Sequence, residues 1–421
     1  MKPPFFHALK RPGLPGILVK AVLFLILCHS FVSGADWPQF LGPERNGVST
    51  ETGLLRTWPR QGPPLLWEKE VGGGFSGPVV AGDRLILCHR VGDQEVVLCL
   101  DANTGKEKWN FAYPTGYVDQ FGFDEGPRST PSLAGERVYT LSAEGKLHCL
   151  DLQTGKKVWQ RSLTTDYQVP AGFFGVATSP LVEGNRLLIN VGGANAGIVA
   201  LDKDTGKELW TATNHEASYS SPVAAMLDGV RQIIFFTREG IVFLDPQTGK
   251  VNYSKHWRAR LNASVNAACP LVVDDYVFVS ASYNTGAILL HARKDGVDEV
   301  WKSDAVMSNH YNTCVAYKGY LYGCDGRQEQ GARLRCVDLK TGQVAWTREG
   351  FGCGTLILAE GNLIILTEDG DLVLAEATPD AYREKARAKV LGKPSRSPIA
   401  LANGRLYARD SKKLACWNLK K

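Results

Sequence analysis

Short apolar runs, rich in β-branched and aromatic residues, alternate along most of the chain with turns that contain Gly and Asp. Representative runs begin at Arg84 (Arg-Leu-Ile-Leu), Arg137 (Arg-Val-Tyr-Thr-Leu), Tyr276 (Tyr-Val-Phe-Val-Ser) and Asn362 (Asn-Leu-Ile-Ile-Leu). Runs of this length and composition predict short β-strands. No stretch of useful length has helical periodicity, so the pattern predicts an all-β protein.

The strands belong to a repeat. The phrase Asp-x-x-Thr-Gly recurs, and an aromatic residue follows four positions after each Gly; the phrases begin at Asp101, Asp151, Asp202, Asp245 and Asp338. A looser copy, Lys294-Asp-Gly, precedes Trp301. A small residue followed by Pro marks the chain before most phrases, as at Gly77-Pro78 and Ser179-Pro180. Asp and Gly favour a tight turn, so each unit predicts strands A, B and C, the turn, and strand D.

Four strands in about 45 residues form one blade of a β-propeller. Trp67 has the position of a strand D that lacks strands A to C before it, whereas residues 397–419 supply strands A to C with no strand D after them. The two ends therefore complete one blade and close the ring. We expect eight blades, with seven as the alternative, and residues 36–64 as an N-terminal extension before a propeller of residues 65–421.

The pattern small-x-Asp-x-x-Thr-Gly-x-x-x-Trp, from Cys99 to Trp109 and again from Cys149 to Trp159, resembles the docking motif of the eight-bladed quinoprotein (PQQ-like) propellers. The resemblance implies that each Trp packs between neighbouring blades; these residues are Trp67, Trp109, Trp159, Trp210, Trp301 and Trp346. The segment that begins Asp36-Trp-Pro-Gln-Phe also resembles one found in exported PQQ-like proteins of bacteria such as planctomycetes.

The first 35 residues have the composition of a signal peptide. Basic residues precede the short apolar run that begins at Ala21, and small residues precede Asp36, so cleavage is expected after Ala35. Cys28 follows Leu27 where a lipoprotein would have a small residue. We therefore expect a secreted or periplasmic protein that neither spans the membrane nor carries a lipid anchor; an uncleaved anchor is the alternative.

Charge and cysteine content narrow the possibilities further. The leader contains four of the basic residues behind the formal net charge of +5, so the rest of the chain is nearly neutral. A protein that binds nucleic acid through phosphate contacts needs a basic surface, which argues against this class. Cys99, Cys149, Cys336 and Cys416 occupy the small position of the repeat, which favours buried thiols over a disulfide framework.

The loops that lead into strand A are expected to meet at the mouth of the propeller axis, and they contain polar side chains. The candidate ligand-facing residues are Asp124, Glu125, Arg128, Tyr219, Asn309, His310 and Arg396. Two arginines could hold a small anionic or carbonyl-bearing ligand, with His310 and Tyr219 as donors. In the alternative interpretation these side chains only bond neighbouring blades. Cys269, Cys314 and Cys353, with His310, are the weaker candidates for a zinc site.

Quinoprotein dehydrogenases bind PQQ and Ca²⁺ at this mouth, and the resemblance would require a Cys-Cys pair and a Trp beneath the quinone. The sequence has no Cys-Cys dipeptide and no Cys-x-x-Cys-His motif. It also has no Gly-x-Ser-x-Gly, P-loop or His-Glu-x-x-His motif. We expect a monomeric, non-catalytic binding or scaffold protein without a cofactor, similar to the propeller of the outer-membrane β-barrel assembly machinery. It would bind an envelope protein or a small ligand. The alternative is a PQQ-dependent dehydrogenase of alcohols or sugars.

Overall fold

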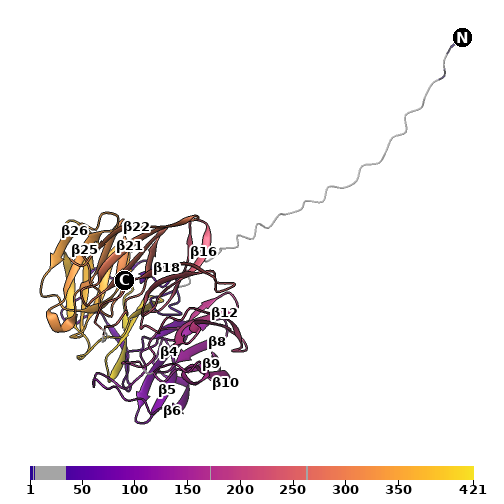
Figure 1. The fold of residues 1–421 in the computed structure, drawn as a ribbon. Helices are drawn as coiled ribbons and strands as arrows, with labels where there is room; N and C mark the ends of the chain where they lie inside the picture. Colours follow the sequence, from indigo (N-terminus) through magenta and orange to yellow (C-terminus); the bar gives the residue numbers. More distant parts are fainter. Residues whose placement is uncertain (3, 5–34, 171, 262–263) are drawn as a thin grey trace. The chain divides into compact units, whose positions relative to one another are not determined.

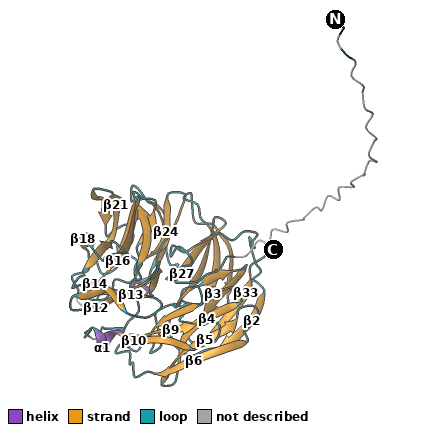
Figure 2. Ribbon diagram, turned by 90° about the vertical axis from the view of Figure 1, so that its right-hand side faces the viewer, coloured by secondary structure: helices purple, strands orange, loops and turns teal. Residues whose placement is uncertain are grey.

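The computed structural model describes residues 1, 2, 4, 35–170, 172–261 and 264–421. The predicted signal peptide lies almost entirely outside the described residues, as does Asn262, which the sequence places before strand A of blade five. The described residues from Ala35 onward form one unit, and strands make up nearly all of its regular structure (Figures 1 and 2). Among the described residues, the helical turns are α1 (Leu163–Asp166) and η1 (Gln328–Gln330).

The strands form eight sheets, each with a core of four antiparallel strands, which confirms the predicted eight-bladed propeller. Blade one consists of β3 (Val79–Ala81), β4 (Arg84–Val91), β5 (Gln94–Asp101) and β6 (Glu107–Pro114), and blade two of β7 (Ser132–Ala134), β8 (Arg137–Leu141), β9 (Lys146–Asp151) and β10 (Lys157–Ser162). Blade three consists of β11 (Leu181–Glu183), β12 (Arg186–Gly193), β13 (Ala196–Asp202) and β14 (Glu208–Ala212), and blade four of β15 (Val223–Leu227), β16 (Val230–Phe236), β17 (Gly240–Leu244) and β18 (Val251–His256).

The second half of the ring repeats this plan. Blade five consists of β19 (Leu271–Val273), β20 (Tyr276–Ala281), β21 (Gly286–Arg293) and β22 (Gly296–Ser303), and blade six of β23 (Val315–Tyr317), β24 (Tyr320–Asp325), β25 (Arg333–Asp338) and β26 (Val344–Arg348). Blade seven consists of β27 (Gly354–Ala359), β28 (Asn362–Thr367), β29 (Asp371–Glu376) and β30 (Glu384–Lys389), and blade eight of β31 (Ala400–Ala402), β32 (Arg405–Arg409), β33 (Lys413–Asn418) and β2 (Leu65–Glu70). The antiparallel pairing of β2 with β33 closes the ring as predicted (Figure 2).

The repeated turn and the tryptophan act together between blades. In the turn at Asp151, its carboxylate accepts hydrogen bonds from the backbone N–H and hydroxyl of Thr154, and Gly155 takes a positive φ of 70°. The ring of Trp109, from the preceding blade, lies so close to Gly155 that a Cβ there would be 2.5 Å from it. Trp109 Nε1 also donates to the Leu152 carbonyl at 3.1 Å. The Gly therefore serves both the turn and the docking of the neighbouring blade.

The same bond, from indole Nε1 to the carbonyl of the residue after the Asp or its equivalent, recurs between blades. The donors are Trp67, Trp109, Trp159, Trp210, Trp301 and Trp346, all six predicted docking residues. In blade seven, which has no Thr-Gly turn, the acceptor of Trp346 is Thr378, two residues after Glu376 at the end of β29. Tyr253 replaces Trp in blade four, so its junction with blade five has no indole donor. The indole bond is thus kept at the junction of blades six and seven, despite the incomplete motif, but it is absent at the junction of blades four and five.

The small residue before Pro links neighbouring blades near the propeller axis. Its backbone N–H donates to the side chain of the equivalent residue in the next blade: Gly77 to Thr130, Thr130 to Ser179, Ser179 to Ser221, Ser221 to Cys269, and Cys269 to Thr313. These donor–acceptor distances are 2.9–3.1 Å. These five bonds form an open series from blade one to blade six, which we call the axial ring. It explains why the position before Pro is small and polar in most blades.

Removing one acceptor from the axial ring should destabilise the fold. In Thr130→Val the shape is nearly kept, but the buried N–H of Gly77 loses its partner, which should lower the free energy of unfolding by about 1–3 kcal/mol. Denaturant unfolding monitored by tryptophan fluorescence measures the change. The exposed Thr50→Val is the matched control and should have almost no effect. Equal stability of the two variants would show that the ring contributes little.

The expected N-terminal extension packs against the propeller. Trp37 exchanges two backbone hydrogen bonds with Val80 in blade one, and Pro38 accepts one from Leu133 in blade two. Further along, β1 (Val48–Ser49) pairs in parallel with β27 of blade seven. The segment between these contacts, residues 39–47, enters the axial channel, and we call it the plug loop.

Arg45 anchors the plug loop. Its guanidinium is buried and donates to Gln39 of the loop, to the Ser132 hydroxyl, and to the carbonyls of Ser179, Pro180 and Pro222. All five N–H groups thus have acceptors, which come from the loop itself and from blades two, three and four. Burial lowers the pKa of Arg45 to about 10, so the group remains charged at neutral pH.

All nine cysteines of the described residues are buried and free of disulfides, as expected for thiols that fill small core positions. Cys99 is paired across the sheet with Trp109 of its own blade. Burial raises the pKa of Cys99 to about 12, which keeps its thiol protonated and unreactive.

Candidate functional site

A cavity of about 410 Å³ opens at the mouth of the propeller axis, and the plug loop contributes Phe40 and Leu41 to its lining. Long loops supply most of the other walls. The loop between β6 and β7 provides Phe121, Phe123 and Arg128. The plug loop that Arg45 anchors therefore forms part of the cavity wall. The volume of the cavity lies in the range of small-molecule and side-chain pockets.

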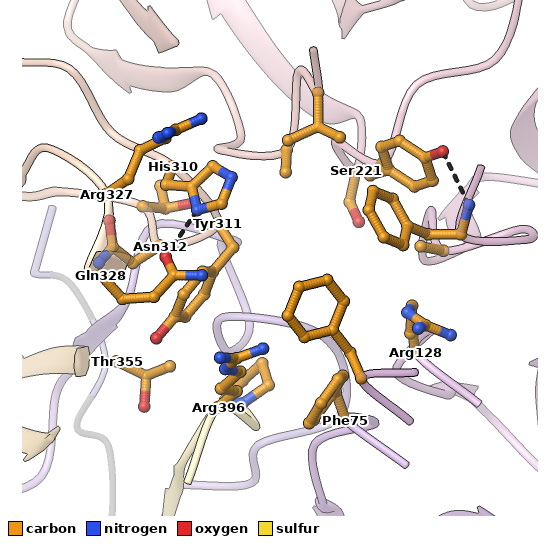
Figure 3. A pocket seen from close by; sticks show the side chains of 18 of the residues that line it. Phe75, Arg128, Ser221, His310, Tyr311, Asn312, Arg327, Gln328, Thr355 and Arg396 are labelled. Carbon is orange, nitrogen blue, oxygen red and sulfur yellow. Dashed lines mark hydrogen bonds between the residues drawn. The ribbon is translucent and has the colours of Figure 1, made fainter. Parts of the chain in front are cut away.

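Four of the seven candidate residues meet at this cavity. Arg128, Tyr219, His310 and Arg396 all line it, although they come from four different loops. Figure 3 shows Phe75 between Arg128 and Arg396, with His310 and Tyr311 on the far side. Both guanidinium carbons lie 5.7 Å from the centre of the Phe75 ring, within the range of a cation–π contact.

The other three candidates do not line the cavity. Asn309 is buried and donates to the Cys324 carbonyl, so it holds its loop against β24. Asp124 accepts a hydrogen bond from the backbone N–H of Gly126. Glu125 is half-exposed and forms an ion pair with Arg90 at 3.7 Å. These side chains shape the surrounding loops.

Each of the two predicted arginines is already paired with a carboxylate. Arg128 Nη2 donates to Asp119 at 3.0 Å, and Arg396 donates through Nε and Nη2 to Glu368 at 2.8 and 2.6 Å. Although burial acts to raise it, backbone N–H donors and Arg128 hold the pKa of Asp119 below its usual range. Asp119 and Glu368 thus neutralise the two cations that were expected to hold an anion.

Asp119 also organises the loop. It accepts hydrogen bonds from the backbone N–H groups of Phe121, Phe123 and Asp124, which turn the two phenylalanines toward the mouth. Asp119, Glu368 and Phe75 stand in no sequence pattern that marks them as residues of the mouth. The nine-residue separation of Asp119 from Arg128 is no recognisable motif, and Glu368 is distant in sequence from its partner. Only the fold brings these groups together.

His310 is held by two neighbours. Its Nδ1 lies 2.8 Å from Gln328 Oε1, which can only accept, and its Nε2 lies 2.9 Å from the Tyr283 hydroxyl. This network assigns the proton to Nδ1 and makes Nε2 the acceptor. Burial is the main cause that lowers the pKa of His310; Arg327 and Arg396 act in the same direction, and Gln328 and Glu329 act against it. His310 therefore favours the neutral form.

This shift predicts a loss of stability in acid. The folded state binds a proton at His310 less readily than the unfolded state. The contribution of neutral His310 to the free energy of unfolding is therefore fully present above the ordinary pKa of about 6.5 and declines as pH falls below it. Unfolding free energies measured from pH 7.5 to 4.5 should fall less steeply for His310→Gln. Tyr283→Phe, which keeps the imidazole, should retain the wild-type slope. Parallel curves for wild type and His310→Gln would contradict the assignment.

The cysteines considered for zinc binding have other partners. Cys269 Sγ accepts the hydrogen bond of Ser221 N–H in the axial ring, and Cys314 Sγ donates to Asn309 Oδ1 at 3.3 Å. Within the part of the chain that the structure describes, no group of three or more His, Cys, Asp or Glu side chains is placed to hold a metal ion. The same residues contain no helix long and apolar enough to cross a bilayer.

Comparison with known proteins agrees with this architecture. The family described as outer membrane protein assembly factor BamB matches residues 47–169 and 93–348. BamB of Moranella endobia (strain PCIT) is 26% identical over 228 residues, which cover 51% of this chain and only 55% of that relative. Among solved structures, BamB from Moraxella catarrhalis gives a TM-score of 0.62 at 18% identity, covering 85% of this chain and 97% of that one.

An enzyme shares the same fold. Quinohemoprotein alcohol dehydrogenase from Comamonas testosteroni gives a TM-score of 0.66 at 14% identity, covering 91% of this chain and 80% of that one. At such identities the two structural matches establish the propeller fold alone. The family match extends over well more than half of the chain and agrees with its repeats and docking tryptophans. The chain therefore belongs to the PQQ-like propeller family described as outer membrane protein assembly factor BamB.

Proposed function

We propose that this protein is an exported, monomeric, non-catalytic binding or scaffold protein of the cell envelope, and that a partner or ligand binds at the cavity on its loop face. The observation that carries the proposal is that the functional groups of the cavity are bonded to one another. His310 has a partner on each nitrogen, and Arg128 and Arg396 each have a carboxylate. Such a site offers shape and apolar surface rather than a poised acid, base or nucleophile.

The hydroxyls in the cavity wall support the same conclusion. Ser179 and Ser221 line the cavity, but each accepts a backbone hydrogen bond of the axial ring. Neither hydroxyl has a histidine among its hydrogen-bond partners in the described residues. A nucleophilic serine needs an adjacent base, so these serines are better suited to holding the blades together.

The residues at the mouth do not fit a calcium-bound quinone. Calcium takes six to eight oxygen ligands, mostly carboxylates and carbonyls. Of the carboxylates here, Asp119 has no exposed side-chain surface and already accepts three backbone bonds and one from Arg128. Glu368 accepts two bonds from Arg396, and Glu329, the carboxylate in the cavity lining, forms an ion pair with Arg327 at 3.7 Å. The dehydrogenase alternative therefore has no observation in its favour beyond the shared fold.

Photo-crosslinking in the native envelope tests the proposal. A photoreactive residue placed at Phe121 or Leu261, both exposed at the mouth, should give a discrete adduct with an envelope component. The same residue at Val300, which is exposed on the outer strand β22, is the control and should give no adduct of that size. Equal labelling from all three positions, or none from the mouth, would argue against a binding role for this face.

A further inference from the structure

An apolar surface extends outward from the cavity. Val118, Phe121, Phe123 and Leu261 have relative exposures of 65, 50, 46 and 56%, and we call these four residues the collar. Phe121, Phe123 and Leu261 also line the cavity. The collar is continuous with the interior through the contact of Phe121 with Phe174, whose ring centres are 5.0 Å apart. Exposed apolar clusters of this kind mark surfaces that a partner covers.

The size of the cavity limits what can enter it. About 410 Å³ accommodates one large side chain or a small molecule, but not a folded element. A small ligand held inside would leave the collar in water. A polypeptide that places one apolar side chain in the cavity would also cover the collar with its flanking residues. The collar therefore favours a protein partner that inserts a single anchor residue.

The charges around the mouth indicate which partner residues, on either side of the inserted anchor, would complement this face. Three ion pairs there have a largely buried guanidinium and an outward carboxylate. The exposed fractions are 14% for Arg90 against 50% for Glu125, 10% for Arg238 against 61% for Glu216, and 25% for Arg327 against 49% for Glu329. What a partner meets at these three points is the carboxylate. Complementary flanking residues are therefore basic.

The three carboxylates lie close to the cavity. Glu329 lines it, and Glu125 is in the loop that supplies Phe123 and Arg128. Glu216 lines a neighbouring hollow of about 500 Å³ that shares Tyr219 with the cavity and also contains Glu144. A chain that leaves the cavity past Tyr219 would therefore enter a second depression, whose lining contains Glu144 and Glu216 as well as Arg238.

We propose that the loop face binds an extended basic segment of a partner protein, with one aromatic or large aliphatic side chain in the cavity and lysine or arginine residues on either side of it. This inference rests on the proposed binding role of the same face and adds the chemistry of the partner. The apolar anchor supplies affinity, and the outward carboxylates of Glu125, Glu216 and Glu329 select the charge of the flanks.

Synthetic peptides test this chemistry on the full purified protein by calorimetry. The probe is acetyl-Gly-Lys-Lys-Trp-Lys-Lys-Gly-amide. We expect it to bind, more weakly as salt is raised, while the versions with Glu in place of Lys or Ala in place of Trp bind at least roughly tenfold more weakly. Equal binding of the glutamate peptide, or of the alanine peptide, would overturn the proposal. Binding of N-acetyltryptophan amide as tight as that of the whole peptide would also overturn it, in favour of a small-molecule site.

Variants of the protein test whether the three glutamates at the mouth cause the preference for a basic peptide. The triple change Glu125→Gln, Glu216→Gln and Glu329→Gln should weaken binding of the basic peptide by roughly tenfold. Arg260→Gln, which removes an exposed cation next to Leu261, should strengthen it. Glu183→Gln is the control away from the mouth, because Glu183 also forms an ion pair with an arginine, Arg231, at the turn between β11 and β12. An effect of Glu183→Gln as large as that of the triple change would overturn the assignment to the mouth.

Variants of the collar test the apolar contribution. Phe121→Asp and Leu261→Asp should abolish binding of the tryptophan peptide, whereas Leu209→Asp on the exposed face of β14 should not. Because all three side chains are half-exposed, the fold should tolerate the changes. If no peptide binds but the mouth still crosslinks to an envelope component, this inference fails and the proposed function stands. If both experiments fail, the proposed function fails too.

Discussion

Arg45→Ala should lower the free energy of unfolding by about 3–5 kcal/mol, which would make it among the most damaging single substitutions in the chain. The change removes five hydrogen bonds from a fully buried guanidinium. It leaves the carbonyls of Ser179, Pro180 and Pro222 without this donor near the propeller axis. It also releases the plug loop, which carries Phe40 and Leu41 of the cavity lining. Denaturant unfolding monitored by fluorescence would measure the loss.

Two further variants separate the guanidinium from the charge. Arg45→Lys keeps the charge but has only three donors from one nitrogen, so most of the destabilisation should persist. Arg56→Ala removes an exposed arginine from the same N-terminal segment and should change stability by less than about 0.5 kcal/mol. Stability of Arg45→Ala close to that of Arg56→Ala would show that the plug loop is not held by this residue.

Trp67→Ala should have a comparably large effect, about 3–5 kcal/mol, because this residue joins the last blade to the first. Trp67 is nearly buried, its Nε1 donates to Ala102 at 3.1 Å, and its ring packs on Gly105. Within its own blade, β2 comes from the N-terminal side of the chain and β33 from the C-terminal end. Loss of the indole therefore weakens the junction at which the ring closes. The midpoint of thermal unfolding should fall accordingly.

The partner position tests the same junction from the other blade. Gly105→Ala places a Cβ 2.7 Å from the Trp67 ring at a φ of +69°, so it should destabilise the fold even though the tryptophan remains. Lys106→Ala, at the neighbouring exposed position, is the control. If Gly105→Ala were as stable as Lys106→Ala, the proposed contact between Trp67 and the turn would be wrong.

Much of the architecture followed from the sequence because a propeller repeats one four-stranded unit, whose turn is formed by residues close together in the chain. The Asp-x-x-Thr-Gly turn needs only residues within five positions of each other, and the apolar runs beside it predict strands wherever they occur. Counting these units predicted eight blades, the closing role of Trp67 and the buried cysteines at positions such as Cys99. Each of these features is confirmed by the strand pairing and burial.

The site depended on contacts that no local pattern encodes. Repeat order placed Arg128, Tyr219, His310 and Arg396 in loops at one end of the axis, and the structure brings these four to one cavity. The order of the repeats could not reveal that Asp119 and Glu368 neutralise the two arginines, or that Asn309 is turned into the core. Pairing between loops depends on distances across the channel, which the spacing of a single repeat does not contain.

The sequence by itself therefore determined the all-β class, the number of blades and the way the ring closes, because these follow from short-range turn chemistry and alternating burial. Only the tertiary structure decided that Arg45 anchors the plug loop, that aromatic side chains line the cavity at the mouth, and that carboxylates neutralise the two arginines predicted to face it. Those features arise where eight separate blades converge on one axis, and there the neighbours of a side chain come from every part of the chain.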